Sequence, residues 1–277
     1  MNPAIRATRK HPACFVLLID QSYSMSGAMS GGRGASKADA VADSTNQLLG
    51  RLVQRCFVDE EARHFFDIAL IGYSDGVGPL LQGPLTGQFL VSPAQMAEAV
   101  SRVHTDASGT SWPVWIEPRA DGETRMCAAF DLARDLVGSW VARHQDSPAP
   151  VVINISDGEA TDGGIDDLAQ RAAALRQLRT DGGELQLFNI AIASQSETPQ
   201  YYPDSPNGLP DKYTKALFDI SSVLTPRLVE YANHFATAAG RPPLRAGARA
   251  FVFNADLAAM VEALSIGSND PNFGNPR

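Results

Sequence analysis

Three oxygen-bearing side chains follow the first apolar run of the chain at alternate positions. The run is Phe15-Val-Leu-Leu-Ile, and the side chains are Asp20, Ser22 and Ser24. Such a run is typical of a strand buried on both faces of a parallel sheet, and open α/β sheets bind ligands at the carboxyl ends of these strands. One carboxylate and two hydroxyls suit a hard divalent cation such as Mg²⁺. A Ser-rich turn that caps the next helix is the alternative, so residues elsewhere in the chain have to distinguish the two.

A second predicted strand also ends in an aspartate, because Asp157 follows Val151-Val-Ile-Asn-Ile-Ser. If the two strands are neighbours, their carboxyl ends lie roughly 5 Å apart. The carboxylates then repel each other unless a cation sits between them. Thr124 opens a long predicted helix and can turn its hydroxyl toward the same edge. Thr110 is a rival for this role, and we favour Thr124 because a helix start follows it directly.

The elements that position these residues alternate along the chain. Buried apolar runs predict strands over residues 15–20, 65–74, 77–81, 151–157, 184–193 and 249–254. Helical periodicity predicts helices over residues 38–56, 93–103 and 123–144, after Asp162 as far as Leu178, from Tyr213 onward, and over 257–264. The stretches 105–121 and 197–210 are expected to be irregular. This alternation predicts an α/β fold with a doubly wound, mainly parallel central sheet flanked by helices.

The predicted organisation is an N-terminal extension over 1–12, a single domain over 13–267 and a C-terminal tail over 268–277. Insertions or loops are expected at 105–121 and 195–212. A chain of 277 residues suits one large α/β domain or a domain with sizeable insertions.

Charge and cysteine usage narrow the class of protein. The formal net charge of -8 gives no overall attraction to nucleic acid or to anionic lipid, so neither a nucleic acid nor a membrane is an expected partner. Cys14, Cys56 and Cys127 are far apart and read as reduced, buried thiols of a cytoplasmic protein. The absence of CxxC and HExxH patterns leaves zinc without support. The first apolar run is too short to span a bilayer.

These motifs resemble the von Willebrand factor type A (VWA) domain family, in particular its intracellular bacterial members. The metal-ion-dependent adhesion site of that family uses DxSxS after the first strand, a Thr at the head of a middle helix, and an Asp, usually followed by Gly, at the end of the fourth strand. The residues here that match those positions are Asp20, Ser22, Ser24, Thr124 and Asp157. The resemblance runs from about Cys14 to Leu264 and departs from most members at Tyr23, where they place Gly.

The resemblance implies a function as well as a fold. It implies Mg²⁺, with Mn²⁺ or Ca²⁺ as alternatives, bound by these five residues with one coordination position left for a carboxylate of a protein partner. It also implies a non-catalytic, cytoplasmic interaction module in a bacterial signalling or stress-response system, with a phosphatase, a kinase or an AAA-type ATPase as the partner. Aromatic residues expected near the same edge could form the interface: Tyr23, Trp112, Trp115, Tyr201 and Tyr202. The alternative for the tryptophans is an ordinary apolar lid over the sheet.

Two enzymatic interpretations of the motifs compete with this one. Gly72-Tyr-Ser74-Asp-Gly76 matches the G-x-S-x-G pattern of serine hydrolases and precedes Asp157 and His234 in the order of that triad, but no helix start follows it. A Mg²⁺-dependent phosphohydrolase could use Asp20 as nucleophile, but it needs a general acid two residues on, where Ser22 stands.

The glycine-rich segment before Lys37 lacks the Gly-Lys-Ser/Thr ending of a phosphate-binding loop, so a flexible surface loop is favoured there. Asp162 is expected to cap the helix that follows it rather than to bind metal.

Overall fold

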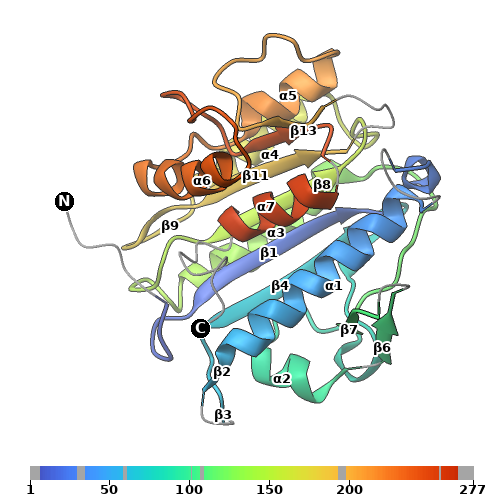
Figure 1. Ribbon diagram of the computed structural model, residues 1–277, viewed down its shortest axis with the longest axis vertical. Helices are drawn as coiled ribbons and strands as arrows, with labels where there is room; N and C mark the ends of the chain where they lie inside the picture. The colour runs from blue at the N-terminus through green and yellow to red at the C-terminus, as the bar shows by residue number, and fades with distance from the viewer. Residues whose placement is uncertain are drawn as a thin grey trace.

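The computed structural model describes residues 7–29, 35–58, 61–100, 102–106, 109–192, 198–255 and 257–267 (Figure 1). The predicted tail over 268–277 and residues 1–6 of the predicted extension lie outside these ranges. Helices are α1 Lys37–Cys56, α2 Pro93–Glu98, α3 Met126–Val141, α4 Ile165–Arg176, α5 Lys212–Ile220, α6 Pro226–Ala238 and α7 Leu257–Gly267, with short 3-10 turns η1 Tyr23–Ser26 and η2 Gly83–Leu85.

A central sheet carries the fold. Within the described residues it has seven strands in the order β12-β13-β11-β8-β1-β4-β5. Their bounds are β1 Ala13–Asp20, β4 Phe66–Tyr73, β5 Val77–Pro79, β8 Val151–Ser156, β11 Gln186–Ala191, β12 Gln200–Tyr201 and β13 Phe251–Phe253. The five inner strands run parallel, whereas the edge strands β5 and β12 pair antiparallel with their neighbours. The predicted doubly wound, mainly parallel α/β fold is therefore confirmed.

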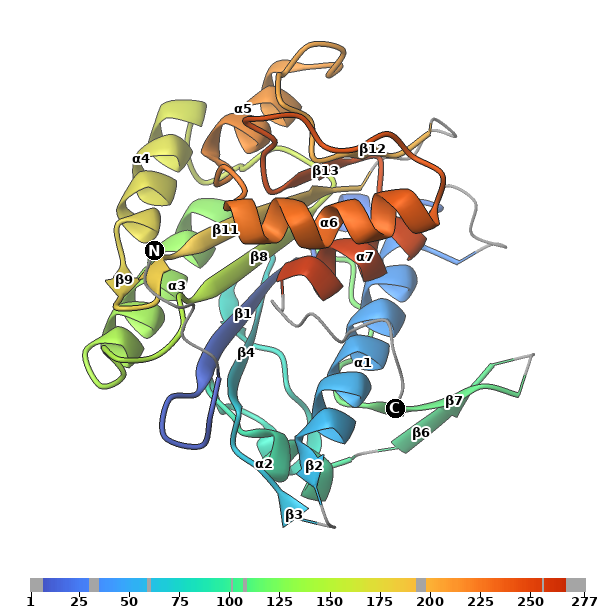
Figure 2. The ribbon, with the colours of Figure 1, turned by 60° about the vertical axis from the view of Figure 1, so that its left-hand side comes forward.

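Helices cover both faces of this sheet, as the alternation of side chains along β1 requires. Phe15, Leu17 and Ile19 pack into one core with residues of α1, α6 and α7. Val16 and Leu18 point the other way, into a second core with α3, α4 and α5. Figure 1 shows α1, α6 and α7 in front of the strands, and Figure 2 shows the two helix layers from the side.

The position of β1 in the sheet decides where its end can bind a ligand. From β1 the chain passes through α1 and pairs β4 on one side; later it passes through α3 and pairs β8 on the other side. The direction of winding therefore reverses between β1 and β8. In open α/β sheets the crevice at such a reversal, outside the carboxyl ends of the strands, is the usual ligand site.

Between residues 93 and 114 the structure differs from the prediction in two places. The helix expected over 93–103 ends at Glu98, and the stretch expected to be irregular forms an antiparallel hairpin, β6 Arg102–Thr105 with β7 Ser111–Val114. Cross-strand pairs hold this hairpin: the rings of His104 and Trp112 lie 4.8 Å apart, and Thr105 and Ser111 share a 2.8 Å hydrogen bond. Figure 2 shows it projecting beyond α1.

The strand expected over 184–193 is also divided. Its first residue belongs to β10 Gly183–Glu184, which pairs with β9 Arg179–Thr180, and only β11 enters the main sheet. A further small pair consists of β2 Phe57–Val58 and β3 Glu61–Ala62. The loop expected over 197–210 contains the edge strand β12, and residues 193–197 lie outside the described ranges.

The three cysteines are buried and free of disulfide bonds, as predicted. Burial raises the pKa of the Cys127 thiol to about 11 and raises the pKa of Cys14 further still. Among the described helices, none combines the length and the apolar character needed to cross a membrane.

Candidate metal centre

The two predicted aspartate-ended strands are direct neighbours. β1 and β8 pair in parallel with Ile19 opposite Ile155, so both reach the edge of the sheet at the same level. The carboxylate of Asp20 is buried there and accepts two hydrogen bonds, from Ser22 N to Oδ1 at 2.8 Å and from Ser156 Oγ to Oδ2 at 2.6 Å. The condition that the sequence analysis left open, that the two strands are neighbours, is therefore met, and β1 itself extends to Asp20.

The turn after β1 brings Ser24 to Asp157 and Ser22 to Ser24. Tyr23–Ser26 forms the 3-10 turn η1, which places the hydroxyls of Ser22 and Ser24 3.0 Å apart. Ser24 Oγ then donates to Asp157 Oδ1 at 2.6 Å. An uninterrupted series of hydrogen bonds therefore joins four of the five predicted ligands: Asp20, Ser22, Ser24 and Asp157.

The segment of the fifth predicted ligand, Thr124, contacts both the turn after β1 and the loop after β8. Thr124 is buried two residues before α3, and its backbone forms two hydrogen bonds with Thr161 in the loop after β8: Thr161 N donates to Thr124 O at 2.9 Å, and Thr124 N donates to Thr161 Oγ1 at 3.1 Å. On the other side, Tyr23 N donates to Gly122 O at 3.0 Å. The rival Thr110 lies in the turn of the β6–β7 hairpin, where its carbonyl accepts from Asp106 N.

A lysine that the sequence analysis considered only as part of a failed phosphate loop belongs to this site. Lys37 Nζ lies 2.5 Å from Asp157 Oδ2, and the two side chains are 5% and 1% exposed. Lys37 is the first residue of α1, directly after the N-cap Ser36. A cation in the first turn of a helix is opposed by the helix dipole. This unfavourable position was the feature of the sequence that could have indicated a role for Lys37 in the site.

The electrostatics of the site follow from two buried acids near one ammonium. Burial raises the pKa of the Asp20 carboxyl, and the nearby charge of Asp157 raises it further, while the hydrogen bonds from Ser156 and Ser22 oppose the change. Both donors to the Asp20 carboxylate, Ser22 N and Ser156 Oγ, are neutral, whereas Asp157 contacts the ammonium of Lys37. The negative charge that remains for a cation to neutralise is therefore concentrated on Asp20.

The donor set fits a hard divalent cation. Asp20, Ser22, Ser24, Thr124 and Asp157 offer only oxygen, with two carboxylates among three hydroxyls, which is the chemistry that Mg²⁺ prefers. Among the described residues no group of three or more His, Cys, Asp or Glu side chains is placed to hold a metal ion. The site therefore depends on its hydroxyls, which makes it unsuited to zinc or copper.

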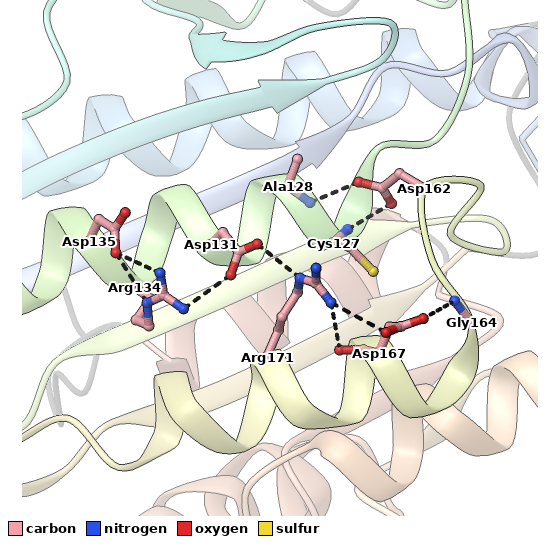
Figure 3. A network of polar contacts seen from close by, with 9 residues as sticks. All are labelled: Cys127, Ala128, Asp131, Arg134, Asp135, Asp162, Gly164, Asp167 and Arg171. Carbon is pink, nitrogen blue, oxygen red and sulfur yellow. Dashed lines mark hydrogen bonds and ion pairs between the residues drawn. The ribbon is translucent and has the colours of Figure 1, made fainter.

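Asp162 fixes the loop that follows Asp157, in a way that differs from the prediction. Its carboxylate accepts from Cys127 N at 3.0 Å and from Ala128 N at 2.8 Å, so it caps the start of α3 and not the helix that follows it (Figure 3). At the start of α4, Gly164 N donates instead to Asp167 at 3.0 Å. This long-range cap ties the loop after β8 to the helix that follows Thr124.

A bridge between α3 and α4 supports the same arrangement. Arg171 on α4 donates to Asp131 on α3 at 2.9 Å, and Arg134 reaches the same carboxylate at 3.2 Å (Figure 3). The pKa of the Arg171 guanidinium is raised, chiefly by its hydrogen bond to Asp131. These groups are partly exposed, so we assign them a modest contribution to stability.

A buried row of polar side chains lies across the sheet beneath the site, and the sequence analysis missed it. Tyr73 Oη donates to Asn154 Oδ1 at 2.8 Å, Asn154 Nδ2 donates to Asn189 Oδ1 at 3.0 Å, and Asn189 Nδ2 donates to Ser221 Oγ at 2.9 Å. Burial raises the pKa of Tyr73 well above its usual range. Because every partner is hydrogen-bonded, the row fixes β4, β8 and β11 relative to one another below Asp20 and Asp157.

Most of the aromatic residues expected at the interface are buried. Trp115 is fully buried and donates from Nε1 to Met96 O at 2.8 Å, and Trp112 packs inside the β6–β7 hairpin. Tyr202 is buried, and Tyr201 lies under the guanidinium of Arg241. Tyr23 is 73% exposed, directly between the two serines. Trp115 belongs to the apolar core on one face of the sheet, as the lid alternative expects, whereas Trp112 packs against His104 within the hairpin. Of the five aromatic residues, Tyr23 is the one exposed at the candidate site.

The geometry needed for a serine hydrolase is absent at Ser74. After Tyr73 the chain turns back into β5, and Ser74 N donates to Gly76 O at 2.9 Å to close that turn. A nucleophile elbow instead requires a helix directly after the strand. Ser74 is buried, whereas His234 is exposed on α6.

The chain was compared with known proteins. No family model matches it, and no curated protein matches it significantly. Solved structures do match. One is von Willebrand factor type A from Catenulispora acidiphila, with 18% identity and a TM-score of 0.42, covering 76% of this chain and 36% of that chain.

Two further matches are bacterial pilus proteins. The vWF domain of the type V pili tip protein Mfa5 from Porphyromonas gingivalis has 18% identity and a TM-score of 0.35, covering 55% of this chain and 39% of that chain. The PilB minor pilin from Streptococcus sanguinis has 11% identity and a TM-score of 0.37, covering 65% and 50%. This chain spans half the length of these structures or less. The chain is similar to these proteins at a level that carries no conclusion about function.

Proposed function

We propose that this protein is a non-catalytic interaction module that binds a carboxylate of a protein partner through a divalent cation. The cation is Mg²⁺, with Mn²⁺ or Ca²⁺ as alternatives, held by Asp20, Ser22, Ser24, Thr124 and Asp157. The observation that carries the proposal is the series of hydrogen bonds that brings the side chains of the DxSxS motif to Asp157 at the reversal point of the sheet.

The chemistry of the site explains why a partner would complete it. When bound, the cation supplies a positive centre with a preference for oxygen ligands, and a partner carboxylate is such a ligand. Ser24 and Tyr23 are exposed, so this side of the site is open to another protein. A single carboxylate contact gives little affinity by itself, and a stable complex buries roughly 1,200–2,000 Å² in total. The wider proposal, by resemblance, is a cytoplasmic role in a bacterial signalling or stress-response system, beside a phosphatase, kinase or AAA-type ATPase.

Thermal melting tests whether the cation binds. Mg²⁺ at about a hundred times its dissociation constant adds about 2.7 kcal/mol to the free energy of unfolding. For a chain of this size that corresponds to a rise of roughly 5 to 10 °C in Tm. We expect this rise in the wild type, a weaker one in Thr124→Ala and none in Asp157→Asn. Asp146→Asn is a matched control, because Asp146 is an exposed acid that lies before the start of β8, whereas Asp157 follows its end.

Water proton relaxation with Mn²⁺ tests whether a coordination position is open. Bound Mn²⁺ that keeps an exchangeable water enhances the relaxation rate, and a peptide that carries a single Glu should lower the enhancement by displacing that water. The same peptide with Gln should leave it unchanged. The proposal is wrong if Mg²⁺ and Mn²⁺ bind no more tightly to the wild type than to Asp157→Asn, or if the Glu and Gln peptides act alike.

A further inference from the structure

A buried ammonium competes for one of the two proposed carboxylate ligands. Lys37 Nζ lies 2.5 Å from Asp157 Oδ2, while Asp157 Oδ1 accepts from Ser24. Both oxygens of this carboxylate are therefore engaged by groups of the protein itself. A divalent cation that reaches Asp157 has to share or replace these contacts.

The position of Lys37 shows that the contact is not a surface ion pair. Its side chain is 5% exposed, at the positive end of α1, where the helix dipole disfavours a second positive charge. Burying an ammonium costs several kcal/mol unless a partner compensates. Asp157 is the partner that the structure supplies. The backbone fixes the base of the side chain nearby, since Lys37 N donates to Gly27 O at 2.8 Å.

The rest of the site shows why this pair would regulate the metal. Asp20 is held by neutral donors, Ser22 N and Ser156 Oγ, so no ammonium has to leave it when a cation arrives. Asp157 differs in this respect. Lysine is a compact charge on a flexible four-carbon stem, so its amine can move while the helix stays in place.

We propose that Lys37 is an internal counter-cation that occupies Asp157 in the metal-free protein and is displaced from it when the divalent cation binds. This inference rests on the proposed function of the same site. Its consequence is that Lys37 lowers the metal affinity, so that the site fills at a higher Mg²⁺ concentration than its oxygen ligands alone would set.

Calorimetric titration with MgCl₂ tests the competition directly. We expect Lys37→Met, which keeps the length of the side chain and removes its charge, to bind Mg²⁺ at least about 10-fold more tightly than the wild type, equivalent to about 1.4 kcal/mol. Lys37→Arg keeps the charge and should not tighten binding. Arg119→Gln removes an exposed cation that pairs with Asp121 near the same edge, and it should change the affinity less than about 2-fold. Lys37→Gln serves as a second neutral variant if Lys37→Met does not fold.

The displacement of Lys37 can also be measured on the wild-type protein alone. Mass spectrometry can follow the acetylation of each lysine by an amine-reactive ester, with chelator and with saturating Mg²⁺. We expect Lys37 to react slowly with chelator and several-fold faster with Mg²⁺, while the exposed Lys215 reacts equally in both.

The outcomes separate this inference from the proposed function. If the wild type binds Mg²⁺ and Lys37→Met binds it no more tightly, the competition is refuted and the metal site stands. If Lys37→Met binds Mg²⁺ and the wild type does not, the competition is supported and the proposed function of the native site fails. If neither binds, or if Lys37 stays equally protected with and without saturating Mg²⁺, the displacement is refuted.

Discussion

The ends of β1 and β4 show how the same kind of strand leads to two different outcomes. Both strands are buried and lie side by side in parallel register, with Asp20 opposite Tyr73. Hydroxyl and carboxylate side chains lie at each end: Asp20, the last residue of β1, with Ser22, and Ser74 with Asp75 after β4. By residue type alone, either end could contribute to catalysis or bind a ligand.

The connections that follow the strands make the difference. After β1 the chain leaves through η1 toward α1, and β8 arrives on the far side, so the end of β1 lies at the reversal point of the sheet. After β4 the chain turns straight back into β5, and the turn is closed by its own backbone. A motif of oxygen-bearing side chains thus forms a candidate site where the topology separates the loops, and a plain turn where it does not.

The turn after β4 still contributes to the neighbouring site, because Asp75 Oδ1 accepts from Glu123 N at 2.9 Å. Gly122, beside it, has a φ of 72° and sits against the Asp75 carboxylate, so a side chain there would be strained and would collide with it. The end of β4 therefore holds the segment that carries Thr124.

The largest expected effect is at Asp20. We expect Asp20→Asn to abolish the Mg²⁺-dependent stabilisation of roughly 2.7 kcal/mol, because it removes the buried carboxylate charge that only neutral donors hold. In the metal-free protein the same change should raise Tm near neutral pH. Burial raises the pKa of this carboxyl in the folded state, so the folded protein binds its proton more tightly than the unfolded chain, and stability falls as pH rises from the unfolded pKa through the folded one.

Thermal melts with chelator and with Mg²⁺, repeated across the acidic range, check this prediction. The gain of Asp20→Asn over the wild type in chelator should shrink as pH falls toward the unfolded pKa of Asp. An equal Mg²⁺ shift in both proteins would place the cation elsewhere and would remove the distinction between the ends of β1 and β4.

The sequence was sufficient for those parts of the fold whose signal is local and continuous. The mainly apolar runs predicted β1, β4 and β8. The aspartates at the ends of β1 and β8 indicated a shared site on the condition that these strands are neighbours, which they are. Ser22 and Ser24 were found because they are close to Asp20 in sequence. These signals depend on residues near one another in the chain.

Contacts between distant residues left no such signal. Asp162 caps α3, which begins 36 positions earlier at Met126, instead of the nearby α4, because the fold brings the loop after β8 against that helix. The β6–β7 hairpin was missed because the exposed Val103 and Pro113 weaken the alternation expected of strands, and tertiary contacts with α1 decide its conformation. Lys37 was discounted because its partner, Asp157, is distant in the sequence.

The second expected effect is at Asp75. We expect Asp75→Ala to weaken Mg²⁺ binding about 5-fold, because the lost hydrogen bond of roughly 1 kcal/mol no longer holds the segment before Thr124. Asp75→Asn keeps an acceptor oxygen and should restore most of the affinity. Asp121→Ala controls for the removal of one negative charge from the same region, since its side chain is exposed and pairs with Arg119. Calorimetric titration measures all three. Equal weakening by Asp75→Ala and Asp121→Ala would assign the effect to charge alone.

The smallest expected effect is at Ser74. A serine hydrolase would lose its activity in Ser74→Ala and would be labelled at this residue by a fluorophosphonate, because the nucleophile has to be exposed at the head of a helix. Ser74 is instead buried in a turn that is closed by a 2.9 Å bond from its own backbone to Gly76 O, and that bond survives the substitution. We expect no labelling of the wild type by mass spectrometry, a change in the free energy of unfolding of about 1 kcal/mol or less, and an unchanged affinity for Mg²⁺. Stoichiometric labelling of Ser74 would contradict the distinction between the two strand ends. The end of β4 would then contain a reactive nucleophile despite the turn into β5.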